Sequence, residues 1–265
     1  MPYVYTNGIR LAYERHGRGE RVLLIMGQAA AGRVWTLHQT PALVRAGYQA
    51  ITLDNRGIPP SDVPQGRYSL TDMVADTKGV IEALDAAPCR IIGASLGAMI
   101  AQEIAIGWPH LVRCAVLIST KSRSDRARAA LEKAERAVLE SGIDLPADYR
   151  AAMTVFQMLS PATLNNDAAF NIWLETFRIS GDDTARGQVG IDTGADRRAA
   201  MRTVTAPCRV ISFADDLITP PHLGAEVADS IPDCDFIEIS GCAHSGYLER
   251  PDEVNAAIIE FLDKN

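Results

Sequence analysis

Residues 90–109 read RIIGASLGAMIAQEIAIGWP, and this stretch decides the fold. The apolar run Arg90–Ala94 predicts a buried strand, and Leu96–Trp108 predicts a helix that ends at Pro109. Between them lies Gly93-Ala94-Ser95-Leu96-Gly97, a G-x-S-x-G pattern. On such a strand-to-helix turn a serine is held in a strained conformation that small neighbours permit, with its hydroxyl exposed above the sheet at a helix N-terminus. The stretch therefore predicts Ser95 as a nucleophile.

Strands and helices alternate on both sides of this stretch. Short apolar runs predict strands at Arg21–Met26, Tyr48–Asp54 and Arg113–Thr120, and helical patterns lie between them at Trp35–Ala46 and Ser69–Leu84. Ser69 and Asp72 have the spacing of a capping box at the start of the second helix. Repeated units of strand and helix predict an α/β protein with a doubly wound, mostly parallel sheet and helices on both faces.

The two ends of the chain complete this sheet. Asn7-Gly8 is a hairpin signal between strands predicted at Tyr3–Thr6 and Ile9–Arg15. Near the C-terminus the alternation continues with strands at Arg209–Ala214 and Asp235–Ile239, a helix at Leu223–Ser230, and a last helix that begins at Pro251. The expected sheet has eight strands.

Residues 122–203 interrupt the alternation. This segment has no strand-like run, and its apolar spacing predicts helices near Asp125–Ser141, Pro146–Leu159, Pro161–Ile179 and Gly194–Val204. We therefore expect a core domain formed by residues 1–121 and 204–265, with 122–203 as a helical insertion. The run Lys121–Arg126 is interpreted as a solvated hinge followed by a helix start.

Composition and charge exclude several classes of function. The chain has 265 residues, with 33 acidic against 26 Lys and Arg residues, and its net charge of -7 has the wrong sign for nucleic acid binding. No apolar segment is long enough for a signal peptide core or a membrane span. The five cysteines are odd in number and form no CxxC pair, so neither disulfides nor a zinc site is indicated. We expect a cytoplasmic protein without membrane contact, metal or organic cofactor; a homo-oligomer stays open.

A serine nucleophile needs a base, and His244 is the best candidate among the five histidines. It lies in Ser240-Gly241-Cys242-Ala243-His244-Ser245-Gly246, directly after the last predicted strand, at the sheet edge where open α/β proteins place their sites. The imidazole needs a carboxylate to fix its tautomer. Asp215 and Asp216, both after the strand Arg209–Ala214, are the candidates.

The order of serine, acid and histidine resembles that of the α/β-hydrolase family. In this family the acid commonly precedes a proline by four residues, which selects Asp216 before Pro220 and leaves Asp215 as the fallback. The resemblance covers nearly the whole chain, and it is carried by the following segments in this order: Asn7-Gly8-Ile9, Asp54–Asp62, the G-x-S-x-G turn, the insertion, and Leu248-Glu249-Arg250-Pro251. It implies the α/β-hydrolase fold with the insertion as a helical cap. Arg56 is interpreted as a structural ion-pair partner.

The resemblance also implies further site residues. An oxyanion hole needs two donors, and the backbone N–H groups of Leu96 and Gln28 have this role by position. Many relatives carry His-Gly-X where this chain has Met26-Gly27-Gln28, a change that we interpret as altered support of the loop. In the cap, the four side chains that we expect to line a substrate pocket are Met153, Phe156, Trp173 and Phe177.

The sequence thus predicts a serine hydrolase that cleaves an ester or thioester of a small hydrophobic substrate, such as a natural product of secondary metabolism. Dehalogenases and epoxide hydrolases of this fold are excluded, because they carry aspartate at the position of Ser95. The alternatives are a lyase, an acyltransferase or a cofactor-free perhydrolase that uses His244 as general base. A ligand receptor without catalysis is the third alternative.

Overall fold

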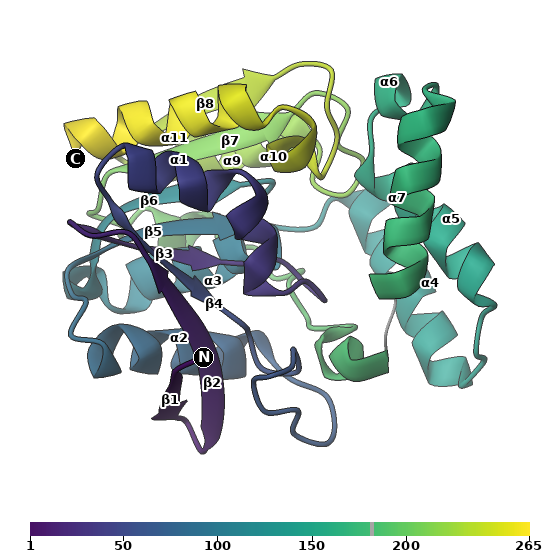
Figure 1. Ribbon diagram of the computed structural model, residues 1–265, viewed down its shortest axis with the longest axis horizontal. Helices are drawn as coiled ribbons and strands as arrows, with labels where there is room; N and C mark the ends of the chain where they lie inside the picture. The colour runs from purple at the N-terminus through teal and green to yellow at the C-terminus, as the bar shows by residue number, and fades with distance from the viewer. Residues whose placement is uncertain (181–182) are drawn as a thin grey trace.

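The structure is a computed structural model that describes residues 1–180 and 183–265. Within these ranges eight strands form one sheet in the order β1-β2-β4-β3-β5-β6-β7-β8 (Figure 1). The first two strands pair antiparallel, β2 also pairs antiparallel with β4, and β3 to β8 are parallel. This is the doubly wound, mostly parallel sheet that the sequence predicts. The strands are β1 (Tyr3–Thr6), β2 (Ile9–His16), β3 (Arg21–Ile25), β4 (Gln49–Leu53), β5 (Cys89–Ala94), β6 (Val112–Ile118), β7 (Cys208–Phe213) and β8 (Cys234–Ile239).

Helices cover both faces of the sheet, and each face has its own apolar core. On β3, Leu23 and Ile25 face one core while Val22 and Leu24 face the other, because successive side chains of a strand point to opposite faces. One face packs against α2 (Leu70–Ala83), α3 (Leu96–Gly107) and α9 (Pro221–Ser230), and the other against α1 (Gln39–Arg45) and α11 (Pro251–Lys264). Burial on both faces explains why these strands are continuous apolar runs.

Local signals set the helix ends. Ser69 and Asp72 form the predicted capping box at the start of α2. The helix predicted at 35–46 is instead divided into a 3-10 helix, η1 (Gly32–Leu37), and α1. Pro41 explains the division, since proline has no N–H to donate to the carbonyl of Leu37 and its ring would clash with that carbonyl in a continuous helix.

The described part of the insertion consists of helices joined by loops, with no strand in it. Its α-helices are α4 (Arg126–Ser141), α5 (Ala147–Met158), α6 (Pro161–Leu164), α7 (Asp167–Ser180) and α8 (Arg198–Met201). A short 3-10 helix, η3 (Asp183–Gln188), lies between α7 and α8. The predicted stretch 161–179 is divided because the Asn166 side chain accepts the N–H of Ala169 at 3.1 Å and so begins a new helix. The stretch predicted at 194–204 contains only the short helix α8.

Helices α4, α5 and α7 stand together at the end of the sheet toward which β7 and β8 point (Figure 1). Residues 181 and 182, inside the predicted insertion, lie outside the described residues. The limits of the insertion as a separate subdomain stay a prediction. None of the helices in the described ranges is long and apolar enough to cross a membrane.

A buried ion pair supports the loops at this end of the sheet. Arg56 donates to both carboxylate oxygens of Asp76 at 2.5 and 2.6 Å, and Asn7 donates to the same carboxylate at 2.9 Å. The carbonyl of Arg56 accepts a hydrogen bond from Gln188, whose side-chain oxygen accepts the N–H of Ala29. The structure confirms the structural role expected for Arg56 and shows that Gln188 ties the insertion to the loops after β3 and β4.

We predict that Arg56→Gln lowers the free energy of unfolding by about 3 to 5 kcal/mol, because it leaves the buried Asp76 without its cation. Arg10→Gln is the matched control. Its partner Asp62 and Arg10 itself are 38% and 44% exposed, so its loss should cost about 0 to 1 kcal/mol. Urea unfolding monitored by circular dichroism measures both values, and equal losses for the two variants would contradict the prediction.

Candidate active site

Ser95 occupies a strained turn between β5 and α3. Its φ of 53° and ψ of -118° lie in a region that side-chain-bearing residues rarely adopt. The flanking glycines make the turn possible. A methyl group at Gly93 would lie 2.4 Å from the carbonyl oxygen of Gly97, and one at Gly97 would lie 2.1 Å from the carbonyl oxygen of Ile25. Both distances are far below contact distance, so only glycine fits, and the serine is held at the N-terminus of α3.

Three side chains from separate loops meet at this turn. His244, in the loop after β8, places its Nε2 atom 3.0 Å from the hydroxyl oxygen of Ser95. Its Nδ1 atom lies 2.8 Å from a carboxylate oxygen of Asp216, in the loop after β7. His244 and Asp216 are both buried. The arrangement is a continuous hydrogen-bonded chain from carboxylate to imidazole to hydroxyl, the geometry that a nucleophile and its base require.

Asp216, and not its neighbour Asp215, makes the contact with His244. Burial alone would raise the pKa of the Asp216 carboxyl, but the attraction of His244 and the hydrogen bonds that it accepts hold this pKa below its ordinary value. Asp215 is half-buried, and its backbone N–H donates to the carbonyl of Cys242. The geometry therefore favours the first of the two candidates.

Thr219 is a residue of this site that the sequence reasoning missed. Its hydroxyl donates to Asp216 at 2.9 Å and lies 3.4 Å from the Nδ1 atom of His244. The backbone N–H groups of Ile218 and Thr219 also donate to the Asp216 carboxylate. An aspartate followed at short spacing by a threonine in a turn is a signal for such a local motif, and it could have been used.

The loop after β3 lies directly against Ser95. A methyl group at Gly27 would be 3.2 Å from the side-chain carbon of Ser95, so the backbone of this loop approaches closely. The side chain of Asn55 donates to the carbonyl of Met26 at 3.0 Å and so supports the loop. Gln28 and Leu96 line the same pocket as Ser95. Their positions are compatible with the oxyanion role, which stays a prediction.

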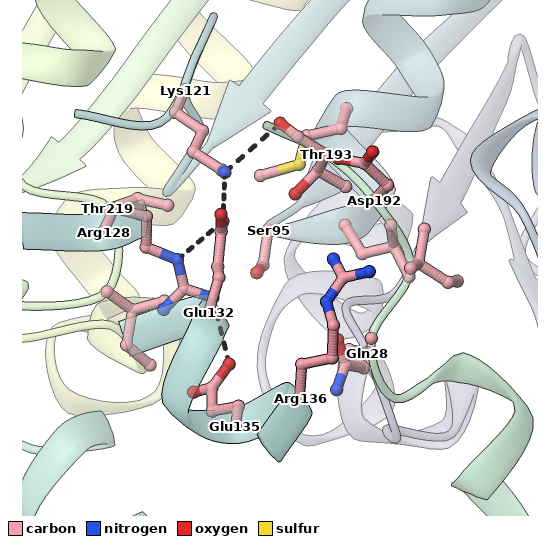
Figure 2. Close-up of a pocket in the computed structure, with 15 residues that line it drawn as sticks. Gln28, Ser95, Lys121, Arg128, Glu132, Glu135, Arg136, Asp192, Thr193 and Thr219 are labelled. Carbon is pink, nitrogen blue, oxygen red and sulfur yellow. Dashed lines mark hydrogen bonds and ion pairs between the residues drawn. The ribbon is translucent and has the colours of Figure 1, made fainter. Parts of the chain in front are cut away.

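The pocket beside Ser95 has a volume of about 60 Å³, and both charged and apolar side chains line it (Figure 2). Helix α4 contributes most of its charged side chains, and the segment 190–193 closes the opposite side. The lining residues are Gln28, Ser95, Leu96, Met99, Lys121, Arg128, Glu132, Glu135, Arg136, Gly190, Ile191, Asp192, Thr193, Ile218 and Thr219.

The four apolar residues expected to line a pocket lie elsewhere in the insertion. Met153 and Phe156 are 41% and 53% exposed, and the Phe156 ring lies 6.4 Å from the ring of Phe170. Trp173 and Phe177 stack on each other at 5.8 Å. None of the four lines the described pocket beside Ser95, and their role in substrate binding stays a prediction.

Lys121 departs from the solvated hinge expected at 121–126. It is buried, and its ammonium group donates to Glu132 and Ser124 at 2.6 Å each and to the carbonyl of Thr193 at 3.2 Å. The hinge interpretation was wrong for Lys121 because the charge has its partners inside the pocket wall. The expected helix start is confirmed, since the Asp125 side chain accepts the N–H of Arg128 and caps α4.

Glu249 connects the His244 loop to the insertion. Its carboxylate accepts the backbone N–H of Ala243 at 2.8 Å and the hydroxyl groups of Ser160 and Thr163 at 2.7 and 2.5 Å. A second link comes from the backbone N–H of Ser245, which donates to the carbonyl of Met158. The Glu249 carboxylate therefore connects Ala243, the residue before His244, to the junction of α5 and α6.

The fold and this hydrogen-bonded chain define a class of protein. The profile of the alpha/beta hydrolase family matches residues 16–257, and the chain belongs to this family. Among its described residues no group of three or more His, Cys, Asp or Glu side chains gathers as a metal site would require.

Several relatives are similar over nearly their whole length. The "Putative non-heme bromoperoxidase BpoC" of Mycobacterium tuberculosis is 43% identical over 257 residues, which is 96% of this chain and 98% of that protein. The crystal structure of BpoC from M. tuberculosis H37Rv superimposes with a TM-score of 0.91 at 42% identity, covering 96% of each chain. The "Putative carbamate hydrolase RutD" of Azorhizobium caulinodans is 27% identical over 98% of both chains.

We predict that the stability contributed by Asp216 is lost in acid. A carboxyl whose pKa is lowered by folding binds its proton more readily in the unfolded chain, so its contribution is present at neutral pH. It disappears as the pH falls through the ordinary value of about 3.9 and below. Asp216→Asn should therefore cost about 1 to 3 kcal/mol at pH 7 and progressively less toward pH 3.5.

Urea unfolding of both proteins across this pH range measures the difference. Asp215→Asn is the matched control, because it removes the same charge one residue away and leaves the contact with His244 intact. A difference between parent and variant that is constant with pH for Asp216→Asn, or that shrinks equally for Asp215→Asn, would contradict the prediction.

Proposed function

We propose that this chain is a serine hydrolase that cleaves an ester or thioester of a small molecule. The observation that carries the proposal is the chain of contacts from Asp216 through His244 to Ser95, with separations of 2.8 and 3.0 Å. The position of Ser95 at the N-terminus of α3 supports it further, because negative charge that develops there is stabilised by the helix dipole.

The reaction proceeds in two halves. His244 Nε2 takes the proton of Ser95 as the hydroxyl oxygen attacks the carbonyl carbon, and Asp216 stabilises the imidazolium. The tetrahedral intermediate collapses when the imidazolium returns this proton to the leaving alcohol or thiol, which leaves an acyl group on Ser95. Water, deprotonated by His244, then attacks the acyl-enzyme. The bond to the Ser95 oxygen breaks as the imidazolium returns the proton to it, and the acid product is released.

The backbone N–H groups of Gln28 and Leu96 hold the oxyanion in both halves. The close approach of Gly27 to Ser95 supports this assignment, because it brings the backbone of this loop near the serine hydroxyl. A donor of this kind stabilises the transition state by roughly 2.7 to 4 kcal/mol. No step of this mechanism draws on a metal or an organic cofactor.

The pocket modifies the expectation about the substrate. Charged side chains of α4 and Lys121 surround the opening above Ser95, so a polar acyl group fits this pocket better than the hydrophobic one that the sequence predicts. We place the activity in the cytoplasm, with which five unpaired thiols agree.

A perhydrolase is the second candidate, favoured by the similarity to BpoC. In this reaction hydrogen peroxide replaces water in the attack on the acyl-enzyme, and the product is a peracid. Both reactions need the same acyl-enzyme, whereas a lyase or a ligand receptor does not. Product analysis with rising peroxide therefore separates the two candidates from each other, and covalent labelling separates them from a lyase or a ligand receptor.

We predict that Ser95→Ala lowers kcat/KM on activated esters by about 10⁴-fold or more, because the nucleophile and its base act as a unit. A fluorophosphonate probe should label the parent at Ser95, as peptide mass spectrometry would show. Ser141→Ala, at the exposed end of α4, is the control and should keep both labelling and rate. Turnover by Ser95→Ala at the parent rate would refute the proposal.

A further inference from the structure

We propose that Arg136 binds a carboxylate on the acyl part of the substrate, so that the site acts on small anionic esters or thioesters. This inference rests on the proposed function and names its substrate class. It comes from the charged groups that surround Ser95 and from the way in which they are paired.

Two of the three cations in the pocket are already neutralised. Lys121 contacts Glu132 at 2.6 Å, and Arg128 contacts Glu132 at 3.1 Å and Glu135 at 3.5 Å. These contacts form one network along α4, which the dashed lines in Figure 2 trace. A substrate anion would have to compete with these carboxylates for either cation.

Arg136 is the third cation, and it has no ion pair or hydrogen bond with any residue of the described ranges. It lies one helical turn beyond Glu132 on α4, and its guanidinium points into the pocket that Ser95 lines (Figure 2). Guanidinium stays protonated at every physiological pH, and its planar fork matches the two oxygens of a carboxylate. It is therefore the group in this pocket that is free to receive one.

The carboxylates around the pocket do not oppose this binding strongly. Glu132 is held by Lys121, Arg128 and Ser124. Glu135 is paired with Arg128 at 3.5 Å. The third carboxylate, Asp192, is exposed to solvent and accepts the N–H of Gly194.

The size of the pocket limits the substrate. A volume of about 60 Å³ is small beside the roughly 300 to 1,000 Å³ of ordinary small-molecule sites. The reacting carbonyl at Ser95 and a carboxylate at Arg136 must both fit in this space. The spacer between them is accordingly short, as in a half-ester of a four-carbon or five-carbon dicarboxylic acid.

Two ethyl esters of equal shape test the inference. Monoethyl succinate carries a carboxylate where ethyl 4-methylpentanoate carries an isopropyl group, and ethanol release measures both. We expect kcat/KM to be at least 10-fold higher for the anionic ester. Arg136→Gln should lower kcat/KM for monoethyl succinate at least 10-fold and change kcat/KM for the neutral ester less than 2-fold. Arg136→Lys should keep part of the preference for the anionic ester.

Lys133→Gln is the matched control, because it removes the same charge from an exposed position of the same helix outside the pocket. It should change kcat/KM for neither substrate more than 2-fold. If the parent cleaves both esters equally, or if Arg136→Gln and Lys133→Gln behave alike, the inference is overturned and the proposed function stands.

A binding measurement covers the case in which the anion site exists but the protein does not cleave esters. Monoethyl succinate is titrated calorimetrically into Ser95→Ala and into Ser95→Ala combined with Arg136→Gln. Binding that needs Arg136, in a protein whose parent form cleaves neither these two esters nor activated esters, would support the anion site and refute the proposed function. Equal binding or no binding in both variants would overturn the inference.

Discussion

The close contact between Gly97 and the carbonyl of Ile25 is the constraint on which the site depends. It brings the first turn of α3 against the end of β3, and a side chain at Gly97 would separate them. A side chain at Gly93, on β5, would clash with the same turn of α3. The turn can then hold Ser95 at a φ of 53°. The same contact brings the loop after β3 alongside the serine, so one packing constraint positions both the hydroxyl and the backbone that we assign to the oxyanion.

The sequence predicts this part of the molecule well because its determinants are local. A buried strand, a glycine-bracketed serine and a helix stop lie within twenty residues, and the loops that carry Asp216 and His244 each follow a predicted strand. Parallel strands deliver those loops to one edge of the sheet, so their meeting follows from topology. Thr219 was within reach of the same reasoning, since its bond to Asp216 spans only three residues.

The pocket could not be predicted in this way, because the placement of the insertion depends on contacts between distant residues. Gln188 reaches the loop after β3 across 159 residues, and Glu249 joins the His244 loop to the insertion across 86 to 89 residues. Helical periodicity shows which side of a helix is apolar, but it does not show which helix turns toward Ser95. That helix is α4, whose described side chains include none that is fully buried, and its charged residues form the wall where the sequence led us to expect aromatic ones.

The residues that stabilise the pocket wall differ from the residue that we propose to bind the substrate, and this difference has a consequence for specificity. Lys121 is buried and pairs with Glu132, so replacing Glu132 would leave a buried cation without its ion-pair partner, at a cost of several kcal/mol. Arg136 is exposed and supports no other described side chain, so it can change with little effect on folding. The residues that hold the pocket open are therefore separate from the residue that can select a ligand. In this arrangement a substitution on α4 can change the preference for substrate charge, while the hydrogen-bonded chain from Asp216 to Ser95 stays intact.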